Sequence, residues 1–533
     1  MSALIAASAL IIAFLIALRL ASKRSSGKDQ DEASRKSGCS PASSADAGFD
    51  QEGEVLPDSG YPESPTVDMA EADLTASVRQ GPFLVLPYVQ LGESGGETLE
   101  IAFAVLNGDR RFDLKVDENA APATRVRLVQ KTTVDLDGLR AHYWYRFAVA
   151  GFQPGKTVKY SVLEDGVCVF SAETKTALPK EASKYRVAVV GDMGTGRPAQ
   201  LEIAYRIHQS GPDLLAMTGD IVYRYGRAGE YLRRHFPVYN ADRAEATLGA
   251  PLLRSVPHFA SAGNHCVAKA DMFDIPSFDV HPDLYAFYLY WSLPLNGPLA
   301  EGDTVSTPHL VGAVRRVDAF LAAAGKRFPT MTNYSFDYGN AHWLVLDANA
   351  YMDWTSKKLR DWVEKDLAAA SGATWKFVNF HQPPFTSNLK HKREKRMRLL
   401  VDIFQKHGVD VVFNGHAHCY ERTFPLKFTL EPHADGSVID DTGLVKGKIE
   451  LDSSFDGVGK TRPDGVIYIV TGAGGAPRDS EYLHEHPELR EPFTCRLIGD
   501  RHSFTLLDVD GDKLSLRQID QDGVEIDVIL LTK

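Results

Sequence analysis

Five short motifs between residues 191 and 418 carry side chains that can coordinate metal ions. Most of them follow or contain an apolar run, and each offers aspartate, asparagine, tyrosine or histidine. The motifs are Gly191-Asp192-Met193-Gly194, Thr218-Gly219-Asp220-Ile221-Val222-Tyr223, Gly263-Asn264-His265, Val378-Asn379-Phe380-His381 and Gly415-His416-Ala417-His418. Oxygen donors combined with imidazoles and no thiolate suit iron, zinc or manganese better than copper(I) or an iron–sulfur cluster. The sequence therefore offers the ligands of a hydrolytic metal centre.

The second motif shows how such side chains can be delivered to one place. The apolar run 214–217 predicts a buried strand, and Asp220 follows in the loop at its carboxyl end. Open α/β sheets place their sites at this edge. One carboxylate can bridge two ions about 4 Å apart, an arrangement that promotes displacement at phosphorus. Each motif alone also fits a turn, a helix cap or a buried histidine, but the ordered set favours ligands.

Residues 181–533 alternate between strand-like and helix-like segments, which predicts an α/β catalytic domain. The stretch 276–330 has no assigned element, and its aromatic residues are expected to border the cleft. The predicted helices are 200–208, 355–370 and 396–406, and the predicted strands are 185–190, 343–346, 375–380, 409–413, 466–470, 504–509 and 526–531.

Residues 79–180 have a different pattern, with short alternating runs separated by turns rich in glycine, aspartate and proline. Several strands at this spacing predict an all-β sandwich. The segment 151–160 resembles the end of a fibronectin type III-like module. Because this region contains no cluster of catalytic residue types, we expect it to be structural or to shape a cleft.

The first 78 residues predict a targeting segment and a linker. Residues 1–21 are mostly apolar and are followed by basic residues, whereas no basic residue precedes them. The length and the charges give conflicting indications of orientation. We interpret the segment as a signal or membrane anchor, with the catalytic part extracytoplasmic, secreted or membrane-anchored. Residues 22–78 are polar, lack apolar periodicity and are expected to form a disordered linker.

Charge and cysteine content exclude some classes of protein. The 533-residue chain has a formal net charge of −11, which argues against nucleic acid as a bulk partner. Metal ions are the simplest local source of positive charge for an anionic substrate. The five cysteines include no Cys-x-x-Cys pair, so a structural zinc site is not predicted. Cys266 and Cys419 each follow a motif histidine, and we interpret them as buried free thiols rather than a disulfide.

Residues 185–475 resemble the purple acid phosphatases, a branch of the calcineurin-like metallophosphoesterases, because all five motifs occur in the family's order. Gly194 stands where the wider family has the histidine of Asp-x-His, and Tyr223 replaces that ligand as in the purple acid branch. The resemblance implies a four-layer αββα metallophosphoesterase sandwich. Many members also carry a β-sandwich before it, which matches the fibronectin type III-like domain predicted here.

The resemblance also implies the metals and the reaction. A ferric ion and a divalent ion (iron, zinc or manganese) would hold a hydroxide that attacks the phosphorus of a phosphate monoester. The implied ligands are Asp192, Tyr223 and His418 for the ferric ion, Asn264, His381 and His416 for the divalent ion, and Asp220 as the bridge.

Two further histidines are implied as catalytic residues. His265 would bind the phosphate or donate a proton to the leaving group, and His391 falls where the family often has a second such histidine. His391 lies in the basic stretch 390–398, so a solvated helix start is an open alternative. Cys266 stands where the family usually has an acidic residue, and Lys390 where plant members often have a histidine. These departures leave the proton donor open.

Three functional hypotheses follow. The first is a binuclear-metal phosphomonoesterase acting on a phosphate ester. The second is a phosphodiesterase or nucleotide pyrophosphatase that uses the same site. The third belongs to another class, a membrane-tethered, non-catalytic binding protein whose metal site is structural. The sequence predicts neither the oligomeric state nor the physiological ester.

Overall fold

The computed structural model describes residues 81–533 except 96–98, 107, 118–123, 127, 150–152, 268–275, 299–306 and 441. The predicted signal or anchor segment 1–21 and the linker 22–78 lie outside these residues, so both stay predictions. Within the described part of the chain, no helix combines the length and the apolar character needed to cross a membrane.

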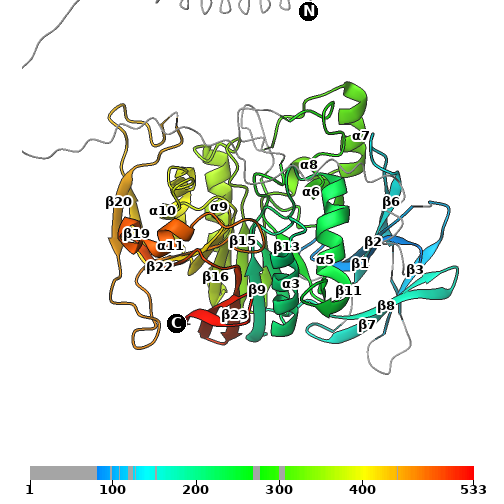
Figure 1. Cartoon of the computed structure of the whole chain (residues 1–533), viewed down its shortest axis with the longest axis horizontal. Coiled ribbons are helices and arrows are strands. Elements are labelled where there is room, and N and C mark those ends of the chain that lie inside the picture. Colours follow the sequence, from blue (N-terminus) through cyan, green and yellow to red (C-terminus); the bar gives the residue numbers. More distant parts are fainter. Residues whose placement is uncertain are drawn as a thin grey trace, which may run out of the picture. The chain divides into compact units, whose positions relative to one another are not determined.

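The first described region is a β-sandwich, as the alternating sequence pattern predicts (Figure 1). One sheet has the order β4-β3-β7-β8, and the facing strands have the order β1-β2-β6-β5. Aromatic side chains such as Phe83, Phe103 and Phe112 fill the space between them and are buried. The strands are β1 (Phe83–Gln90), β2 (Leu99–Val105), β3 (Phe112–Asp117), β4 (Thr124–Val126), β5 (Leu128–Val134), β6 (His142–Val149), β7 (Thr157–Glu164) and β8 (Val167–Lys175).

The first sheet of the α/β region continues directly into this sandwich. Its order is β25-β24-β23-β9-β10-β13-β1-β2-β6-β5, and β9, β10 and β13 are parallel. The junction is the parallel pair Gln90 in β1 and His258 in β13. Hydrogen bonds therefore cross the boundary predicted at residue 180, and the two regions share one sheet. The further strands are β9 (Lys184–Val190), β10 (Leu214–Met217), β13 (His258–Ala260), β23 (Ser503–Asp510), β24 (Lys513–Asp520) and β25 (Glu525–Thr532).

The second sheet has the order β14-β15-β16-β17-β21-β18-β22, with β15, β16, β17 and β21 parallel. Two short two-stranded sheets, β11-β12 and β19-β20, lie outside it. These strands are β11 (Asn240–Glu245), β12 (Gly249–Pro251), β14 (Tyr334–Tyr338), β15 (Ala341–Val345), β16 (Trp375–Asn379), β17 (Val411–Asn414), β18 (Tyr420–Thr423), β19 (Leu426–Leu430), β20 (Gly447–Leu451), β21 (Ile467–Thr471) and β22 (Thr494–Ile498).

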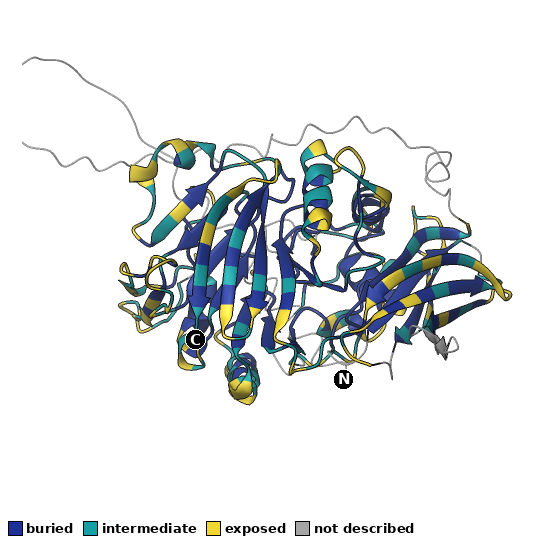
Figure 2. Ribbon diagram, turned by 90° about the horizontal axis from the view of Figure 1, so that it is seen from below, coloured by how far each residue is buried: buried dark blue, intermediate teal, exposed yellow. Residues whose placement is uncertain are grey.

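Alternation along the second sheet explains the layering. Trp343 and Val345 of β15 belong to the core shared with the first sheet, whereas Leu344 faces a second core with Leu359 and Val363 of a helix. Successive strand side chains point to opposite faces, so sheet packs on sheet and helices cover the outer face. Figure 2 shows the strands largely buried, with exposed residues at the periphery. The α/β region is thus the mixed metallophosphoesterase sandwich that the resemblance implied.

The helical segments cover the sheets and the connections between them. Two long helices agree with the predicted ranges 200–208 and 355–370, and the predicted helix 396–406 is a 3-10 segment followed by a short α-helix. The long helix at 314–324 lies in the stretch for which no element was predicted. The helical segments are α3 (Pro198–Ser210), α4 (Ala228–Glu230), η1 (Tyr231–His235), α5 (Phe236–Tyr239), α6 (Phe287–Tyr290), α7 (Val314–Ala324), α8 (Arg327–Thr330), α9 (Lys357–Ala369), η2 (Ala370–Gly372), η3 (Arg396–Leu400), α10 (Val401–Lys406), α11 (Glu481–Glu485) and η4 (Pro487–Leu489).

The aromatic residues of the stretch 276–330 lie in the core rather than at a cleft. Phe287, Tyr288, Tyr290 and Trp291 are between 0% and 2% exposed. The hydroxyl of Tyr88 in β1 donates to the backbone oxygen of Tyr290 at 2.8 Å. The expectation that these rings border the cleft was wrong, because they attach α6 to the β-sandwich instead.

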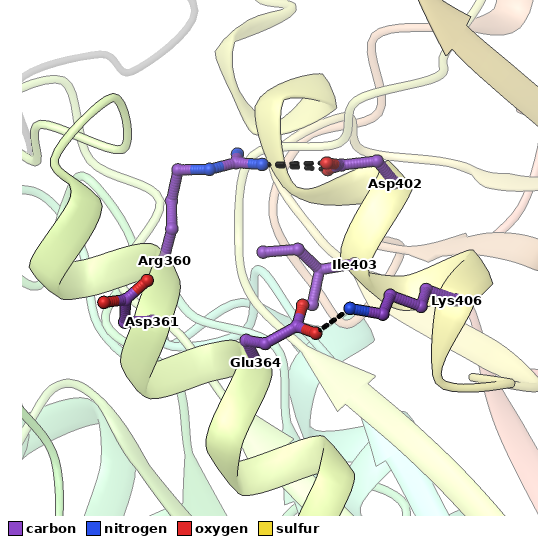
Figure 3. Close-up of a pocket in the computed structure, with 6 residues that line it drawn as sticks. All are labelled: Arg360, Asp361, Glu364, Asp402, Ile403 and Lys406. Atoms are coloured by element: carbon purple, nitrogen blue, oxygen red, sulfur yellow. Dashed lines mark hydrogen bonds and ion pairs between the residues drawn. The ribbon is translucent and has the colours of Figure 1, made fainter.

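A surface groove between α9 and α10 is lined by charged side chains (Figure 3). Arg360 of α9 contacts Asp402 of α10 at 2.8 Å, and Lys406 pairs with Glu364 across the same groove. None of these residues belongs to the five motifs. The ion pairs across the groove therefore hold α9 and α10 together, and the groove is not part of the predicted site.

Candidate metal centre

The five motifs meet because each follows a parallel strand. Asp192, Asp220, Asn264, His381 and His416 come within a few residues of the last residue of β9, β10, β13, β16 and β17, respectively. The carboxyl ends of parallel strands share one edge of a sheet, and the two sheets bring these edges together. The edge predicted from the sequence is the edge that carries the motifs.

Three of the implied ferric ligands are mutual neighbours. The Tyr223 hydroxyl lies 3.0 Å from Oδ1 of Asp192 and 3.2 Å from Nε2 of His418. Nε2 of His418 is itself 3.5 Å from Oδ1 of Asp192. One phenol, one carboxylate and one imidazole therefore converge from three separate loops.

The other three ligands form a second group around an amide oxygen. Oδ1 of Asn264 lies 3.1 Å from Nε2 of His381 and 3.0 Å from Nδ1 of His416. Asp220 joins the groups, because its Oδ2 is 3.2 Å from Nε2 of His381, which lies 3.9 Å from Oδ1 of Asp192. Asp192, Asp220 and His381 are each fully or almost fully buried and could together hold a cation.

Outer partners fix which nitrogen of each histidine faces the centre. Nδ1–H of His381 donates to the backbone oxygen of Thr218 at 2.7 Å, and Nδ1–H of His418 donates to that of Pro477 at 2.6 Å. His416 is oriented the other way, since its Nε2–H donates to Glu394 at 3.1 Å and its Nδ1 faces inward. Metal-binding histidines are typically oriented by such hydrogen bonds.

The electrostatics of the site favour cations. Burial by itself lowers the pKa of His381, but the carboxylates of Asp220 and Asp192 outweigh it and raise that pKa to about 9. The pKa of His418 is shifted in the same way, because Asp192 and Asp479 outweigh the lowering effect of burial and raise it to about 9. Burial also opposes ionisation of Asp220, yet the neighbouring histidines hold its pKa below the ordinary value. Hard donors, converging lone pairs and surplus negative charge fit a pair of metal ions.

Glycines next to the ligands are required by close packing. A Cβ on Gly263 would lie 2.2 Å from Oδ1 of Asp220, and one on Gly415 would lie 2.5 Å from Oδ2 of Asp192. Asp192, Asp220 and His416 themselves have left-handed backbone with φ of 58°, 47° and 72°. Non-glycine residues adopt this conformation at a cost that the surrounding fold must offset, and such strain clusters at functional sites.

His265 lies beside the centre as predicted from the motif Gly-Asn-His. Its backbone N–H donates to Oδ1 of Asp220 at 2.8 Å, and its ring centroid lies 4.4 Å from that of Tyr223 with the rings tilted by 51°. Nδ1–H donates to the backbone oxygen of Arg224 at 2.6 Å, which leaves Nε2 3.8 Å from Oδ2 of Asp220. The ring is therefore directed at the position between the two groups of ligands.

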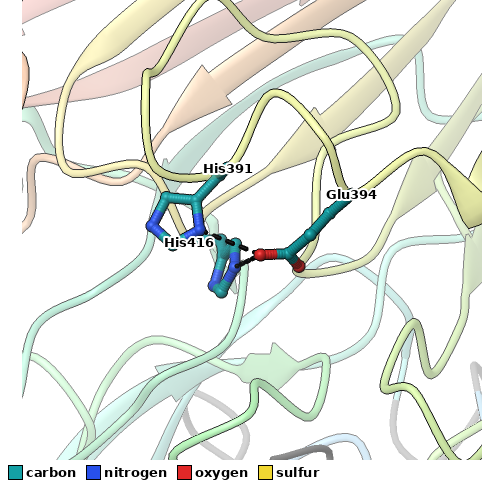
Figure 4. A group of neighbouring side chains, drawn as sticks. All are labelled: His391, Glu394 and His416. Atoms are coloured by element: carbon teal, nitrogen blue, oxygen red, sulfur yellow. Dashed lines mark hydrogen bonds and ion pairs between the residues drawn. The ribbon is translucent and has the colours of Figure 1, made fainter. Parts of the chain in front are cut away.

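His391 also reaches the site, and it precedes the next helical segment, η3, which begins at Arg396. Its ring centroid lies 3.8 Å from that of His416, and its Nδ1 is 3.1 Å from Oε1 of Glu394 (Figure 4). Glu394 contacts both histidines, although it was not predicted as a site residue. The available signal was an acidic residue within a basic stretch, three residues after His391.

The trio His391, Glu394 and His416 could also be considered as a separate cation site. His416 can bind through Nδ1 beside Asn264 only when its Nε2 keeps a proton, and Glu394 accepts that proton's hydrogen bond. The same nitrogen cannot hold a further ion at the same time. Glu394 therefore orients the two histidines rather than forming a centre of its own.

The two cysteines that follow motif histidines are free thiols, as predicted. Cys266 and Cys419 are both fully buried. Burial raises the pKa of Cys266 to about 12, so its thiol stays protonated. Its sulfur accepts a hydrogen bond from the backbone N–H of Ile221 at 3.5 Å, which places it behind the Asp220 loop.

Comparison with known proteins agrees with this geometry. Residues 185–420 match the family described as calcineurin-like phosphoesterase. This part of the chain belongs to the calcineurin-like metallophosphoesterases, a family that implies a binuclear metal site. The expected family is therefore confirmed.

Its distant homologues are named purple acid phosphatases. Purple acid phosphatase 15 of Arabidopsis thaliana is 25% identical over 304 residues, covering 53% of this chain and 50% of that protein. Acid phosphatase type 7 of Mus musculus is 24% identical over 384 residues, covering 65% and 67% of the two chains. The matches span 50%, 64% and 58% of three Arabidopsis relatives, the purple acid phosphatases 15, 23 and 13.

A solved structure shares the architecture. The purple acid phosphatase from yellow lupin (Lupinus luteus) seeds superposes with a TM-score of 0.59 at 17% identity, covering 84% of this chain and 74% of the lupin chain. At this identity the similarity shows the fold, a β-sandwich region followed by the α/β metallophosphoesterase domain.

Proposed function

We propose that the protein hydrolyses phosphate monoesters at a binuclear metal centre. The observation that carries the proposal is the convergence of seven predicted ligands with Asp220 between the two groups. The homologues named acid phosphatases support this activity at about a quarter identity. We assign Asp192, Tyr223 and His418 to a ferric ion, and Asn264, His381 and His416 to a divalent ion of iron, zinc or manganese.

When bound, such ions acidify an attacking water and neutralise the phosphoryl oxygens. The chain's own residues hold and orient the reacting groups. Ligand atoms of Asp220, of Asp192 in one group and of His381 in the other lie within 4.8 Å of one another, so Asp220 can link the two groups. His265 and His391 lie beside them, where an imidazole can bind a phosphoryl oxygen or give a proton to the departing alkoxide.

The phenol of Tyr223 supports the ferric assignment. A phenolate next to a carboxylate and an imidazole requires a strongly Lewis-acidic partner. For localisation, we propose an extracytoplasmic catalytic region, on the basis of the apolar residues 1–21.

Hydrolysis of p-nitrophenyl phosphate and of bis-p-nitrophenyl phosphate by the purified, metal-loaded protein tests the proposal. We expect kcat/KM for the monoester to exceed that for the diester by at least about tenfold. A preference for the diester would favour the phosphodiesterase hypothesis. No turnover of either ester with full metal content would favour the binding protein.

A further inference from the structure

A buried glutamate lies behind the loop that follows Tyr223. Glu230 is 6% exposed and is the third residue of the helical run α4-η1-α5, which begins at Ala228. Its Oε2 accepts the backbone N–H of Arg227 at 2.9 Å and of Tyr225 at 3.1 Å. Its Oε1 accepts the backbone N–H of Arg224. One carboxylate therefore holds three of the four residues in the loop 224–227.

These contacts exceed what a helix cap requires. A capping glutamate at the third helical position binds the N–H of the cap residue, here Arg227. The bonds to Arg224 and Tyr225 reach residues that precede the helix and contribute nothing to its N-terminus. They fix the backbone direction of the loop itself.

The loop in turn determines the orientation of His265. The carbonyl of Arg224 accepts Nδ1–H of His265 at 2.6 Å. The loop also packs directly against the backbone of the histidine, because a Cβ on Gly226 would lie 2.6 Å from the oxygen of His265 and 2.5 Å from that of Cys266. Turning the Arg224 carbonyl would therefore remove the hydrogen bond that orients the ring.

We propose that Glu230 is a positioning residue that sets the direction of the His265 imidazole through the loop 224–227. With Nδ1–H held by Arg224, Nε2 is presented to the Asp220 side of the centre. Glu230 touches neither substrate nor ligands and acts only through the backbone. The predicted effect on catalysis rests on the proposed phosphatase activity, whereas the predicted effect on the backbone of the loop 224–227 does not.

Glu230→Gln, Glu230→Asp and His265→Ala test this in the full-length, metal-loaded protein. Glutamine replaces one accepting oxygen with a donor, so it opposes a backbone N–H. Aspartate keeps the charge but is too short for all three bonds. Glu245→Gln is the matched control, since the Glu245 side chain on β11 is 43% exposed and pairs with Arg243.

The structural measurement is hydrogen exchange of the backbone amides of residues 224–227. We expect exchange to accelerate at least about tenfold in Glu230→Gln and to stay unchanged in Glu245→Gln. Unchanged exchange in both Glu230 variants would overturn the proposal, even if the protein hydrolyses no ester. If Glu230→Gln does not fold, the exchange of the same amides is compared between Glu230→Asp, Glu245→Gln and the wild type.

The functional measurement is a double-mutant cycle between Glu230 and His265. We expect His265→Ala to weaken orthophosphate binding or kcat about 10- to 100-fold in the wild type but less than about threefold in Glu230→Gln. We expect metal content and KM to change little in Glu230→Gln. General destabilisation of the loop would alter these two quantities as well. Equal His265→Ala effects in both backgrounds would refute the positioning role. An inactive wild type would refute the phosphatase proposal alone, because the double-mutant cycle can still be measured from orthophosphate binding.

Discussion

Nε2 of His381 lies 3.1 Å from Oδ1 of Asn264, a residue 117 positions earlier in the chain. Nδ1 of His381 carries a proton, since it donates to the Thr218 carbonyl. Two acceptor atoms at this distance repel unless a positive charge lies between them. A proton fills that role in the metal-free protein, and a metal ion would replace it.

Metal loading should therefore release protons. The pKa of His381 is raised to about 9 and that of His418 to about 9, so both rings are charged at about pH 7 without metal. Ligation requires neutral imidazole, so the two rings alone should release about two protons per chain, and the Tyr223 phenol releases a further proton when it binds as a phenolate. Titration of the metal-free protein in weak buffer with a pH indicator measures this. The histidine contribution to the release should vanish above about pH 10, and the absence of any release at about pH 7 would contradict the ligand assignment.

Tyr223→Phe should remove any visible charge-transfer absorption of the iron-loaded protein. The phenol oxygen is the atom that contacts Asp192 and His418, and phenylalanine keeps the ring that packs against His265. Tyr338→Phe is the control, because the Tyr338 hydroxyl donates to the backbone oxygen of Asp213, which lies outside the five motifs. Absorption spectra of the three proteins decide the question. A band that survives in Tyr223→Phe would remove tyrosine from the ligand set.

Gly263→Ala should abolish hydrolysis while the fold is retained. The new methyl would lie 2.2 Å from Oδ1 and 2.4 Å from the backbone nitrogen of Asp220, so the bridging carboxylate must move. A displacement of this size should lower kcat at least about 100-fold. Gly372→Ala serves as the control because no atom lies within 4 Å of its added Cβ. Wild-type kcat in Gly263→Ala would show that Asp220 has another position.

The arrangement of the site was largely predictable, whereas the residues that orient it were not. Asp220 was found because an apolar run ends in Gly-Asp, and parallel strands bring such ends together. The position of Glu394 in a basic stretch, three residues after His391, was the only local signal, and its contact with His416 could not be predicted because that partner lies 22 residues away. Glu230 escaped notice because it binds backbone N–H groups, which every residue possesses.

The same holds for the fold: elements set by local sequence periodicity were predictable, whereas contacts between segments far apart in the sequence were not. Strands and helices with clear periodicity, such as α9 and β16, lie within a few residues of the predicted ranges. The shared sheet was not foreseen, because it depends on one parallel pair, Gln90 with His258, from regions that the sequence separates. Burial of Tyr290 and its neighbours likewise depends on β1 covering them.

Stability should depend on pH through His342, away from the metal centre. Burial lowers its pKa, but Asp337 at 2.8 Å and Asp366 at 2.9 Å outweigh burial and raise it to about 9. Because the folded-state pKa lies above the unfolded value, this stabilisation is complete below about pH 6.5 and is lost as pH rises through about 9.

His342→Gln should therefore lower the free energy of unfolding by about 2–3 kcal/mol at about pH 6 and by much less at about pH 10. Denaturant unfolding of the wild type, His342→Gln and the control His486→Gln, whose side chain is 41% exposed, at both pH values measures the difference. An equal loss at the two pH values would mean that the ion pairs do not carry the effect.

The most direct test of the metal centre is the metal content of the purified chain, alongside Asp220→Asn. Because Asp220 lies close to both Asp192 of one group and His381 of the other, we predict about two metal ions per wild-type chain and fewer than about one per Asp220→Asn chain, both folded. One ion or none in a folded wild type, or full occupancy without the Asp220 carboxylate, would contradict the binuclear site.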